Sequence, residues 1–422
     1  FAKFPSSVLA VWLEIPLAIA FGFWIKRSSL PFWIKTLVST ILLYTCIYIG
    51  ILVPIELPGL FGLPATGLWT LILLAYAFIA SILPVSLLLQ PRDYLNAWQL
   101  YVALALIVGG IIVCSILGEL NFVAPAINTN PTGAPSMWPF LFITIACGAL
   151  SGFHCLICSG TSAKQINSEA DAQYVGYGSM LMEAGLALVV IIAVGAGLGL
   201  AYHSGSETLF GTQAFQAHYG SWQASAGLGS KLSAVVIGCS NMMARLGIPI
   251  EFGIAIVGVF IASFAGTTLD SATRVQRYIV SECGVYLKKS WIQHKYGATA
   301  ISVISAALLA FSSGMNGKGA LELWPLFGAV NQLLGGLALL VITVYLSKRV
   351  KYAIVVTGIP CLTVLVITLW ATIINQRQFW FNDQWLLLIV NSIIILLAIT
   401  ICIEGATVLT QLLVKKRQKV MA

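Results

Sequence analysis

Long apolar runs recur along the whole chain, and they constrain its fold more than any other feature of the sequence. Each run has enough residues to cross about 30 Å of hydrocarbon as a helix. Of the 422 residues, 59% are hydrophobic and only 9% are charged, whereas a typical soluble domain is about 25% charged. The alternating pattern of membrane-barrel strands is absent. The sequence therefore predicts an all-α, polytopic membrane protein.

The apolar runs predict about eleven transmembrane helices. Their approximate limits are 8–25, 33–55, 67–89, 97–117, 139–160, 174–202, 249–276, 298–313, 323–346, 353–373 and 385–411. Most of the 22 basic residues, Arg92 among them, then fall in alternate loops and in the C-terminal tail. Because cytoplasmic loops collect Lys and Arg, this alternation predicts that the C-terminus is cytoplasmic.

The same alternation divides the chain into a few regions. It holds only if the helical stretch 231–246 does not cross the membrane. We therefore expect one transmembrane domain over 1–422, an external loop with a surface helix at 203–248, and a basic cytoplasmic tail at 412–422. The basic residues form no patch with interleaved aromatics, which excludes nucleic acid as an expected partner. The chain starts without Met, and we expect further N-terminal helices of the same protein to be missing from it.

A polar stretch, "SGFHCLICSGTSAKQI" at 151–166, interrupts the fifth apolar run. The helical pattern from 139 to 166 would measure about 42 Å as one straight helix. Its glycines and hydroxyl residues disfavour a continuous helix, so we expect a broken helix near 148–162. Such breaks line cavities, where backbone amides suit an anion and hydroxyls suit a cation. Close helix packing through Gly148 and Gly152, or a capped loop, is the alternative.

The same stretch also invites a metal or haem interpretation. His154, Cys155 and Cys158 stand in the order "HCLIC", the reverse of the haem attachment motif, and no second ligand pair follows. We therefore expect no cofactor other than a coupling ion, H⁺ or Na⁺.

Acidic residues inside the apolar runs are candidate functional groups. Glu183 lies about 14 Å deep in its span, and Glu14 is also well inside its own. A carboxylate at that depth is costly unless it is protonated, paired or solvated by a cavity. Each is therefore either a functional group or a hydrogen-bonded lock between two helices.

Asp270 lies near one end of its span, in "FAGTTLDSATRVQRY". It could pair with Arg274 one turn later. Alternatively, Thr267, Asp270 and Ser271 share one helical face, with Thr268 beside it, and supply oxygen ligands for a cation or a proton path. His154, a proton-titratable group, is a further coupling candidate.

Four motifs, in this order, give the chain a family resemblance. They are "LPVSLLLQPRDYLNAW", "ITIACGALSGFHCLICSGTSAKQI", "GYGSMLMEAGLAL" and "FAGTTLDSATRVQRYI". Together they resemble the carbon starvation protein A (CstA) family of bacterial inner-membrane transporters for pyruvate or peptides. The resemblance implies an inverted-repeat architecture of the amino acid, polyamine and organocation type. The family's N-terminal glycine-rich motif, GHHFxxIAGAGP, is absent from this chain.

We therefore predict a cation-coupled symporter, not an enzyme, for uptake of pyruvate or small peptides across the bacterial inner membrane under carbon limitation. Its expected partners are the lipid bilayer and a small carboxylate or peptide substrate. A membrane-embedded enzyme, a structural subunit of a membrane complex, or a channel is the alternative. The predicted substrate-binding residues are Gly152, Phe153, His154, Ser159, Gly160 and Thr161. The predicted coupling residues are His154, Glu183, Thr267, Thr268, Asp270 and Ser271.

Overall fold

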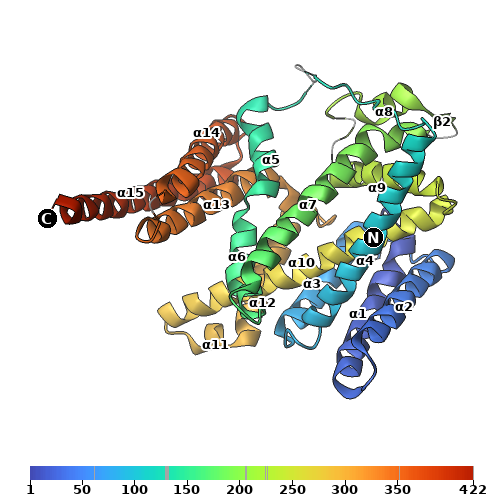
Figure 1. Cartoon of the computed structure of the whole chain (residues 1–422), viewed down its shortest axis with the longest axis horizontal. Helices are drawn as coiled ribbons and strands as arrows, with labels where there is room; N and C mark the ends of the chain where they lie inside the picture. Colours follow the sequence, from blue (N-terminus) through green and yellow to red (C-terminus); the bar gives the residue numbers. More distant parts are fainter. Residues whose placement is uncertain are drawn as a thin grey trace. The chain divides into compact units, whose positions relative to one another are not determined.

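The computed structural model describes residues 1–422 except 61, 129–132, 205–206, 224, 226, 351 and 422, and it describes only the backbone at 146, 409 and 412–421. Its contacts group the chain into two compact units (Figure 1). Unit 1 comprises Phe1–Ala134 and Leu181–Lys318, and unit 2 comprises Pro135–Met180 and Gly319–Ala422. One transmembrane domain over 1–422 therefore stays a prediction.

Unit 1 holds most of the long helices. They are α1 (Pro5–Arg27), α2 (Phe32–Leu52), α3 (Ala65–Ile82), α4 (Leu89–Ile116), most of α7 (Asp171–Gly195), η3 (Gly197–Leu200), α8 (Gly211–Tyr219), α9 (Leu228–Ala244), α10 (Ile250–Tyr286), α11 (Ser290–Gln293) and α12 (Lys295–Ala310). A short antiparallel hairpin, β1 (Tyr202–Ser204) with β2 (Glu207–Leu209), follows η3.

Unit 2 is built around a broken helix and three long ones. Its elements are η1 (Met137–Leu141), α5 (Phe142–Ala149), α6 (Gly152–Gly160), η2 (Ser162–Lys164), η4 (Gly319–Leu323), α13 (Trp324–Ser347), η5 (Ile354–Gly358), α14 (Ile359–Phe381) and α15 (Trp385–Met421). The start of α7 also belongs to this unit. The predicted tail at 412–422 continues α15 as helix to Met421; its side chains and residue 422 lie outside the described part of the chain.

Prolines mark where several of these helices begin. Pro5 lies in the first turn of α1, and Pro325 in the first turn of α13. Pro31, Pro64 and Pro249 immediately precede α2, α3 and α10. The first turn of a helix has no internal partner for its amides, so the missing N–H of proline costs little there. These residues therefore fix helix starts without weakening the helices.

The helical, membrane-spanning character is confirmed. Within the described residues, ten segments are long and apolar enough to cross a membrane, and they include the broken segment Met137–Lys164. The predicted span 298–313 corresponds to α12, which has 16 residues. At 1.5 Å per residue it measures about 24 Å, less than the hydrocarbon thickness. By length and composition the count is thus ten, with α12 as a shorter apolar helix.

The predicted helix at 231–246 forms as α9 and is partly buried, and its placement on the external face stays a prediction. Val236, Met242 and Met243 are fully buried in a cluster with residues of α4 and α10. Its small residues allow this packing: a Cβ at Gly238 would meet the backbone of Ala193 in α7. The charge alternation alone does not specify how much of such a short apolar helix is buried. Residues 205–206, 224 and 226 of the predicted external loop lie outside the described residues.

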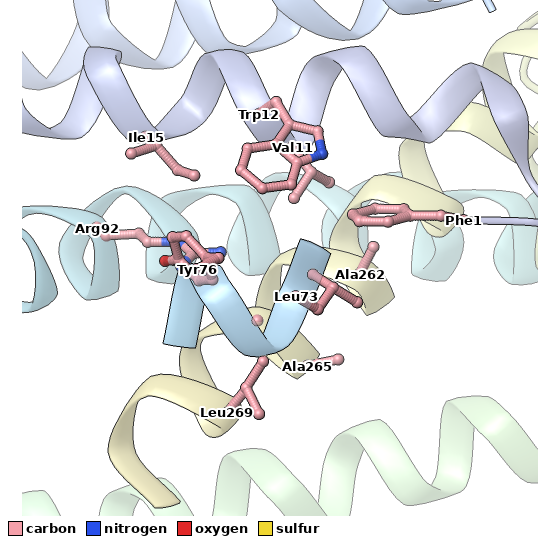
Figure 2. Close-up of a pocket in the computed structure, with 11 residues that line it drawn as sticks. Phe1, Val11, Trp12, Ile15, Leu73, Tyr76, Arg92, Ala262, Ala265 and Leu269 are labelled. Carbon is pink, nitrogen blue, oxygen red and sulfur yellow. Dashed lines mark hydrogen bonds between the residues drawn. The ribbon is translucent and has the colours of Figure 1, made fainter. Parts of the chain in front are cut away.

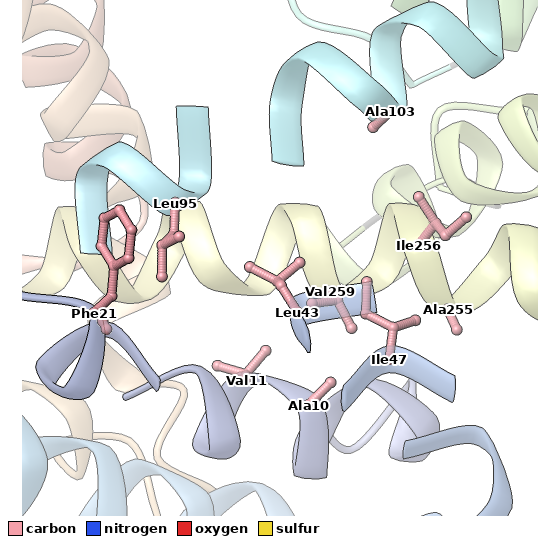
Figure 3. Packing of buried hydrophobic residues seen from close by; sticks show 11 residues of the cluster. Ala10, Val11, Phe21, Leu43, Ile47, Leu95, Ala103, Ala255, Ile256 and Val259 are labelled. Carbon is pink, nitrogen blue, oxygen red and sulfur yellow. The ribbon is translucent and has the colours of Figure 1, made fainter. Parts of the chain in front are cut away.

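A shared hydrophobic core holds α1, α2, α4 and α10 together (Figure 3). Val11 of α1, Leu43 of α2, Leu95 of α4, and Ile256 and Val259 of α10 are each at most 5% exposed. Between helices in lipid, close van der Waals packing of such side chains stabilises the association. This packing brings together polar residues one or two turns away on α1, α4 and α10.

Candidate functional site

A buried ion cluster joins three helices of unit 1. Arg92 on α4 donates from Nε to Oε1 of Glu14 on α1 at 3.3 Å, and from Nη1 to Oδ2 of Asp270 on α10 at 3.0 Å. All three residues are 1% exposed. Buried ions need partners of opposite charge and further hydrogen bonds, and here one guanidinium serves two carboxylates.

Two more residues complete the hydrogen bonding of this cluster. The hydroxyl of Tyr76 on α3 donates to Asp270 Oδ2 at 2.8 Å and accepts from Arg92 Nη1 at 2.6 Å. Ser263 on α10 donates its hydroxyl to Glu14 Oε2, and its carbonyl accepts from Arg92 Nη2 at 3.4 Å. Glycine at 266 leaves room for this arrangement, because a Cβ there would lie 2.6 Å from Arg92 Nη2 and would displace it. We call Glu14, Tyr76, Arg92, Ser263 and Asp270 the arginine cluster.

The arginine cluster holds one more acidic than basic group. Asp270 Oδ1 is buried and has no hydrogen-bond partner among the described residues. Asn96, one turn after Arg92 on α4, donates from Nδ2 to Thr267 Oγ1 on α10 at 2.9 Å. The Oδ1 atom of Asn96 is likewise buried without a described partner. Buried acceptors of this kind are rare in folded proteins. The arrangement therefore offers a position for a proton or a cation.

A pocket of about 180 Å³ adjoins the arginine cluster. Figure 2 shows Arg92 and Tyr76 close together at one part of its lining, with side chains of α1, α3 and α10 around the rest. Trp12, Leu73 and Leu269 are among the apolar lining residues. The pocket thus combines a guanidinium and a phenol with an apolar wall, the composition expected of a small-molecule site.

The residues predicted on α10 divide into two groups. Asp270 belongs to the arginine cluster, and Thr267 is hydrogen-bonded to Asn96 next to it. Thr268 is exposed and Ser271 is half-buried. The structure thus brings together two of the four.

The expected ion pair between Asp270 and Arg274 is not formed in the described part of the chain. Arg274 instead donates from Nη2 to the carbonyl oxygens of Ala80 and Leu83 at the C-terminal end of α3, at 3.0 and 2.9 Å. Arg277 likewise donates to Ser81 O at 2.7 Å. A cation at a helix C-terminus satisfies carbonyls without internal partners and interacts favourably with the helix dipole. This competing site explains why the helical spacing misled the prediction.

The predicted broken helix is confirmed in unit 2. α5 ends at Ala149, Ser151 is extended with φ −125° and ψ 130°, and α6 begins at Gly152. A Cβ at Gly152 would lie 2.5 Å from the carbonyl oxygen of Asn331 on α13. Gly148 has no neighbour that close, so only the second glycine of the pair makes a tight helix contact.

Two amides at this break, those of Phe153 and His154, already have side-chain partners, and binding of an anion at the break stays a prediction. Asn331 Oδ1 accepts from the amide of Phe153 at 2.7 Å, and Ser151 Oγ accepts from that of His154 at 3.5 Å. Asn331 Nδ2 also donates to Ser151 Oγ at 3.0 Å. Asn331 thus caps α6 from a position 178 residues away in the chain. The local sequence around α6 does not reveal this cap.

The other predicted site residues differ in how far their side chains are exposed. His154 and Ser159 are exposed, Phe153 and Gly160 are half-buried, and Thr161 is buried with no described partner for its hydroxyl. Glu183 is exposed on α7, in unit 1, whereas His154 belongs to unit 2. Their roles in binding or coupling stay predictions.

Tyr76, Arg92 and Ser263 are the residues of the arginine cluster that the sequence did not identify as site residues. Arg92 falls in a predicted loop because the apolar run begins only at about residue 97, whereas α4 begins at Leu89. A signal was present: Arg92, Asn96 and Gln99 recur at helical spacing, and all three are at most 2% exposed. A polar stripe of this kind on an apolar helix indicates a buried face.

The described residues offer no group of three or more His, Cys, Asp or Glu side chains that could hold a metal ion.

Comparisons with known proteins identify one family. The model of the family "Carbon starvation protein CstA" matches residues 1–371. No solved structure matches the chain, so the inverted-repeat architecture stays a prediction.

Three relatives illustrate the match. The peptide transporter CstA of Helicobacter pylori is 32% identical over 418 residues, covering 89% of this chain and 60% of the relative. The peptide transporter CstA of Mycobacterium tuberculosis is 34% identical over 423 residues, covering 88% and 54%. The pyruvate/proton symporter BtsT of Escherichia coli is 31% identical over 451 residues, covering 91% and 61%. The chain thus spans less than two thirds of the length of these relatives.

Proposed function

Because the chain belongs to the carbon starvation protein CstA family, we propose that it forms a large part of a secondary active transporter for small carboxylates or peptides. The names of its relatives support this class: some are peptide transporters and one is a pyruvate/proton symporter. The ten apolar segments support a multi-pass protein. We place it in the bacterial inner membrane with a cytoplasmic C-terminus, and we assign it to uptake under carbon limitation.

The arginine cluster is the single observation that best supports cation coupling. It lies within helices that are candidate membrane spans, and it places two carboxylates against one guanidinium. A net charge at membrane depth costs several kcal/mol and marks ion or proton pathways in transporters. A site with an excess carboxylate can bind and release one cation, H⁺ or Na⁺, in each cycle.

The energetics of an anionic substrate favour the same coupling. Import of one negative charge against a potential of 100 mV, negative inside, costs about 2.3 kcal/mol. One co-transported cation removes this cost, because substrate and cation together are neutral. Uptake of a carboxylate such as pyruvate therefore gains directly from a coupling site.

A substrate site at the broken helix is a second candidate. Gly152, Phe153 and the following residues of α6 would line it, as the sequence predicted. The amide of Phe153 is bonded to Asn331, so an anion would bind there only after exchanging places with that side chain. Substitution of Asn331 by alanine would then change substrate affinity, whereas a purely structural cap would change stability alone.

Uptake by the complete protein tests the proposal. Purified protein in liposomes is given labelled pyruvate or labelled dialanine, with H⁺ and Na⁺ gradients imposed separately. We expect accumulation of at least one substrate above its external concentration under at least one gradient. Conversion of substrate to product without accumulation would contradict the proposal and support a membrane-embedded enzyme, and binding without either would support a structural subunit.

A further inference from the structure

We propose that Arg92 binds the substrate carboxylate in the adjoining 180 Å³ pocket, and that it becomes available when Asp270 takes up a proton. This inference rests on the proposed transport function. It assigns the substrate's charged group to unit 1 and the coupling proton to one named carboxylate, which the family membership alone does not do.

Hydrogen bonding identifies Asp270 rather than Glu14 as the proton acceptor. Both oxygens of Glu14 receive a donor: Oε1 from Arg92 and Oε2 from Ser263. Asp270 receives its donors, Arg92 and Tyr76, on Oδ2 alone, and Oδ1 has none among the described residues. Of the two carboxylates of the arginine cluster, only Asp270 therefore has an oxygen without a described donor, where a proton can bind.

Protonation of Asp270 changes what Arg92 can do. The carboxylic acid no longer carries the charge that holds Arg92 Nη1, and charge-assisted hydrogen bonds are roughly twice as strong as neutral ones. Nε stays paired with Glu14. Nη1, beside the Tyr76 hydroxyl at the pocket lining, can then exchange Asp270 for the carboxylate of a substrate.

The charges balance in both states of this exchange. In the empty state Glu14 and Asp270 are anionic and Arg92 is cationic, which gives a net charge of −1. In the loaded state Asp270 is neutral and the substrate carboxylate replaces its charge, which again gives −1. One proton and one carboxylate thus enter together, and the transported pair is neutral.

Two further charged groups lie near this exchange. Arg274, one turn from Asp270, directs its guanidinium to carbonyl oxygens of α3. Asp93, next to Arg92 on α4, has an exposed side chain. We assign the coupling proton to Asp270 and not to either of these groups.

The volume of the pocket favours a small substrate, and the arginine cluster favours a proton as the coupling ion. Its volume of about 180 Å³ is below the range of about 300–1,000 Å³ typical of drug-sized ligands, so it suits a carboxylate with a few heavy atoms better than a peptide. A metal cation binds to several oxygen atoms at once. Asp270 Oδ1 and Asn96 Oδ1 are two oxygens without a described partner, fewer than a metal cation needs, whereas a proton needs only one.

The test uses the complete protein in liposomes and compares D270N with wild type and with E251Q. Glu251 is an exposed acidic residue in the first turn of the same helix and gives a matched control. We expect D270N to lose pH-gradient-driven accumulation of pyruvate at least tenfold but to keep counterflow exchange, because the amide imitates the protonated acid. R92K should lose both, and E251Q should keep both.

Three results separate the possible failures. If wild-type protein accumulates neither pyruvate nor dialanine under any gradient, the proposed transport function itself fails. If wild-type uptake is driven by a pH gradient and D270N behaves like E251Q, the transport function stands and this inference is overturned. If D270N is not recovered folded, wild type alone decides: pH-driven pyruvate uptake should not change when a potassium–valinomycin potential is imposed, and a potential-dependent rate would overturn the neutral exchange.

Discussion

Replacement of Arg92 by glutamine should destabilise the protein far more than replacement of either carboxylate that it binds. R92Q leaves Glu14 and Asp270, both 1% exposed, without a counter-charge. Removal of one partner from a buried ion pair costs about 3–5 kcal/mol. D270N keeps an oxygen that accepts from Arg92 and Tyr76 and leaves a one-to-one ion pair, so we expect a loss of about 1 kcal/mol or less.

Unfolding in mixed micelles, followed by circular dichroism during a titration with sodium dodecyl sulfate, measures both changes. The triple variant E14Q/R92Q/D270N is the control, because it removes every charge of the arginine cluster at similar volume. Neutral replacement of a whole buried ion network is often tolerated, so the triple variant should regain at least half of the stability that R92Q loses. If R92Q and D270N lose the same free energy of unfolding, Arg92 is not the single counter-charge of two buried carboxylates, and the reasoning is refuted.

Three further predictions concern other parts of the chain. N331L removes the acceptor for the Phe153 amide and should lower the free energy of unfolding by about 1–3 kcal/mol, measured in the same titration; an unchanged value would show that α6 is not capped. G266A displaces Arg92 and should weaken pyruvate binding several-fold in calorimetry, whereas G185A, at an open position, should not. Burial lowers the pKa of His218 on α8, so the folded state binds fewer protons than the unfolded state. Stability should therefore fall as the pH drops below about 6.5, and H218Q should reduce that slope; an identical slope would contradict it.

Local patterns were sufficient to predict the helices and the break in the fifth run. Apolar runs give the spans, and glycines with hydroxyl residues give the break between Ala149 and Gly152. The depth estimate also identified Glu14 as a buried acid, but it placed Glu183 at a similar depth although the side chain of Glu183 is exposed. These features depend on residues within one helix, so a single sequence contains them.

The partners of these residues could not be predicted in the same way. In sequence, Arg92 is 78 residues from Glu14 and 178 residues from Asp270. Asn331 is likewise 178 residues from Phe153. Such pairs depend on how helices pack, which hydropathy and helical period do not specify. Arg92 was placed in a loop for the same reason: the charge pattern distinguishes loops from spans, but not a buried first turn from an exposed one.

The number of protons taken up when a carboxylate binds tests the central claim most directly. Calorimetric titration of pyruvate into the complete protein, in buffers with different ionisation enthalpies at one pH, measures this number. Exchange of Asp270 for substrate on Arg92 predicts one proton taken up for each pyruvate bound by wild type, and none by D270N. Binding without proton uptake in wild type, or the same uptake in D270N, would contradict it.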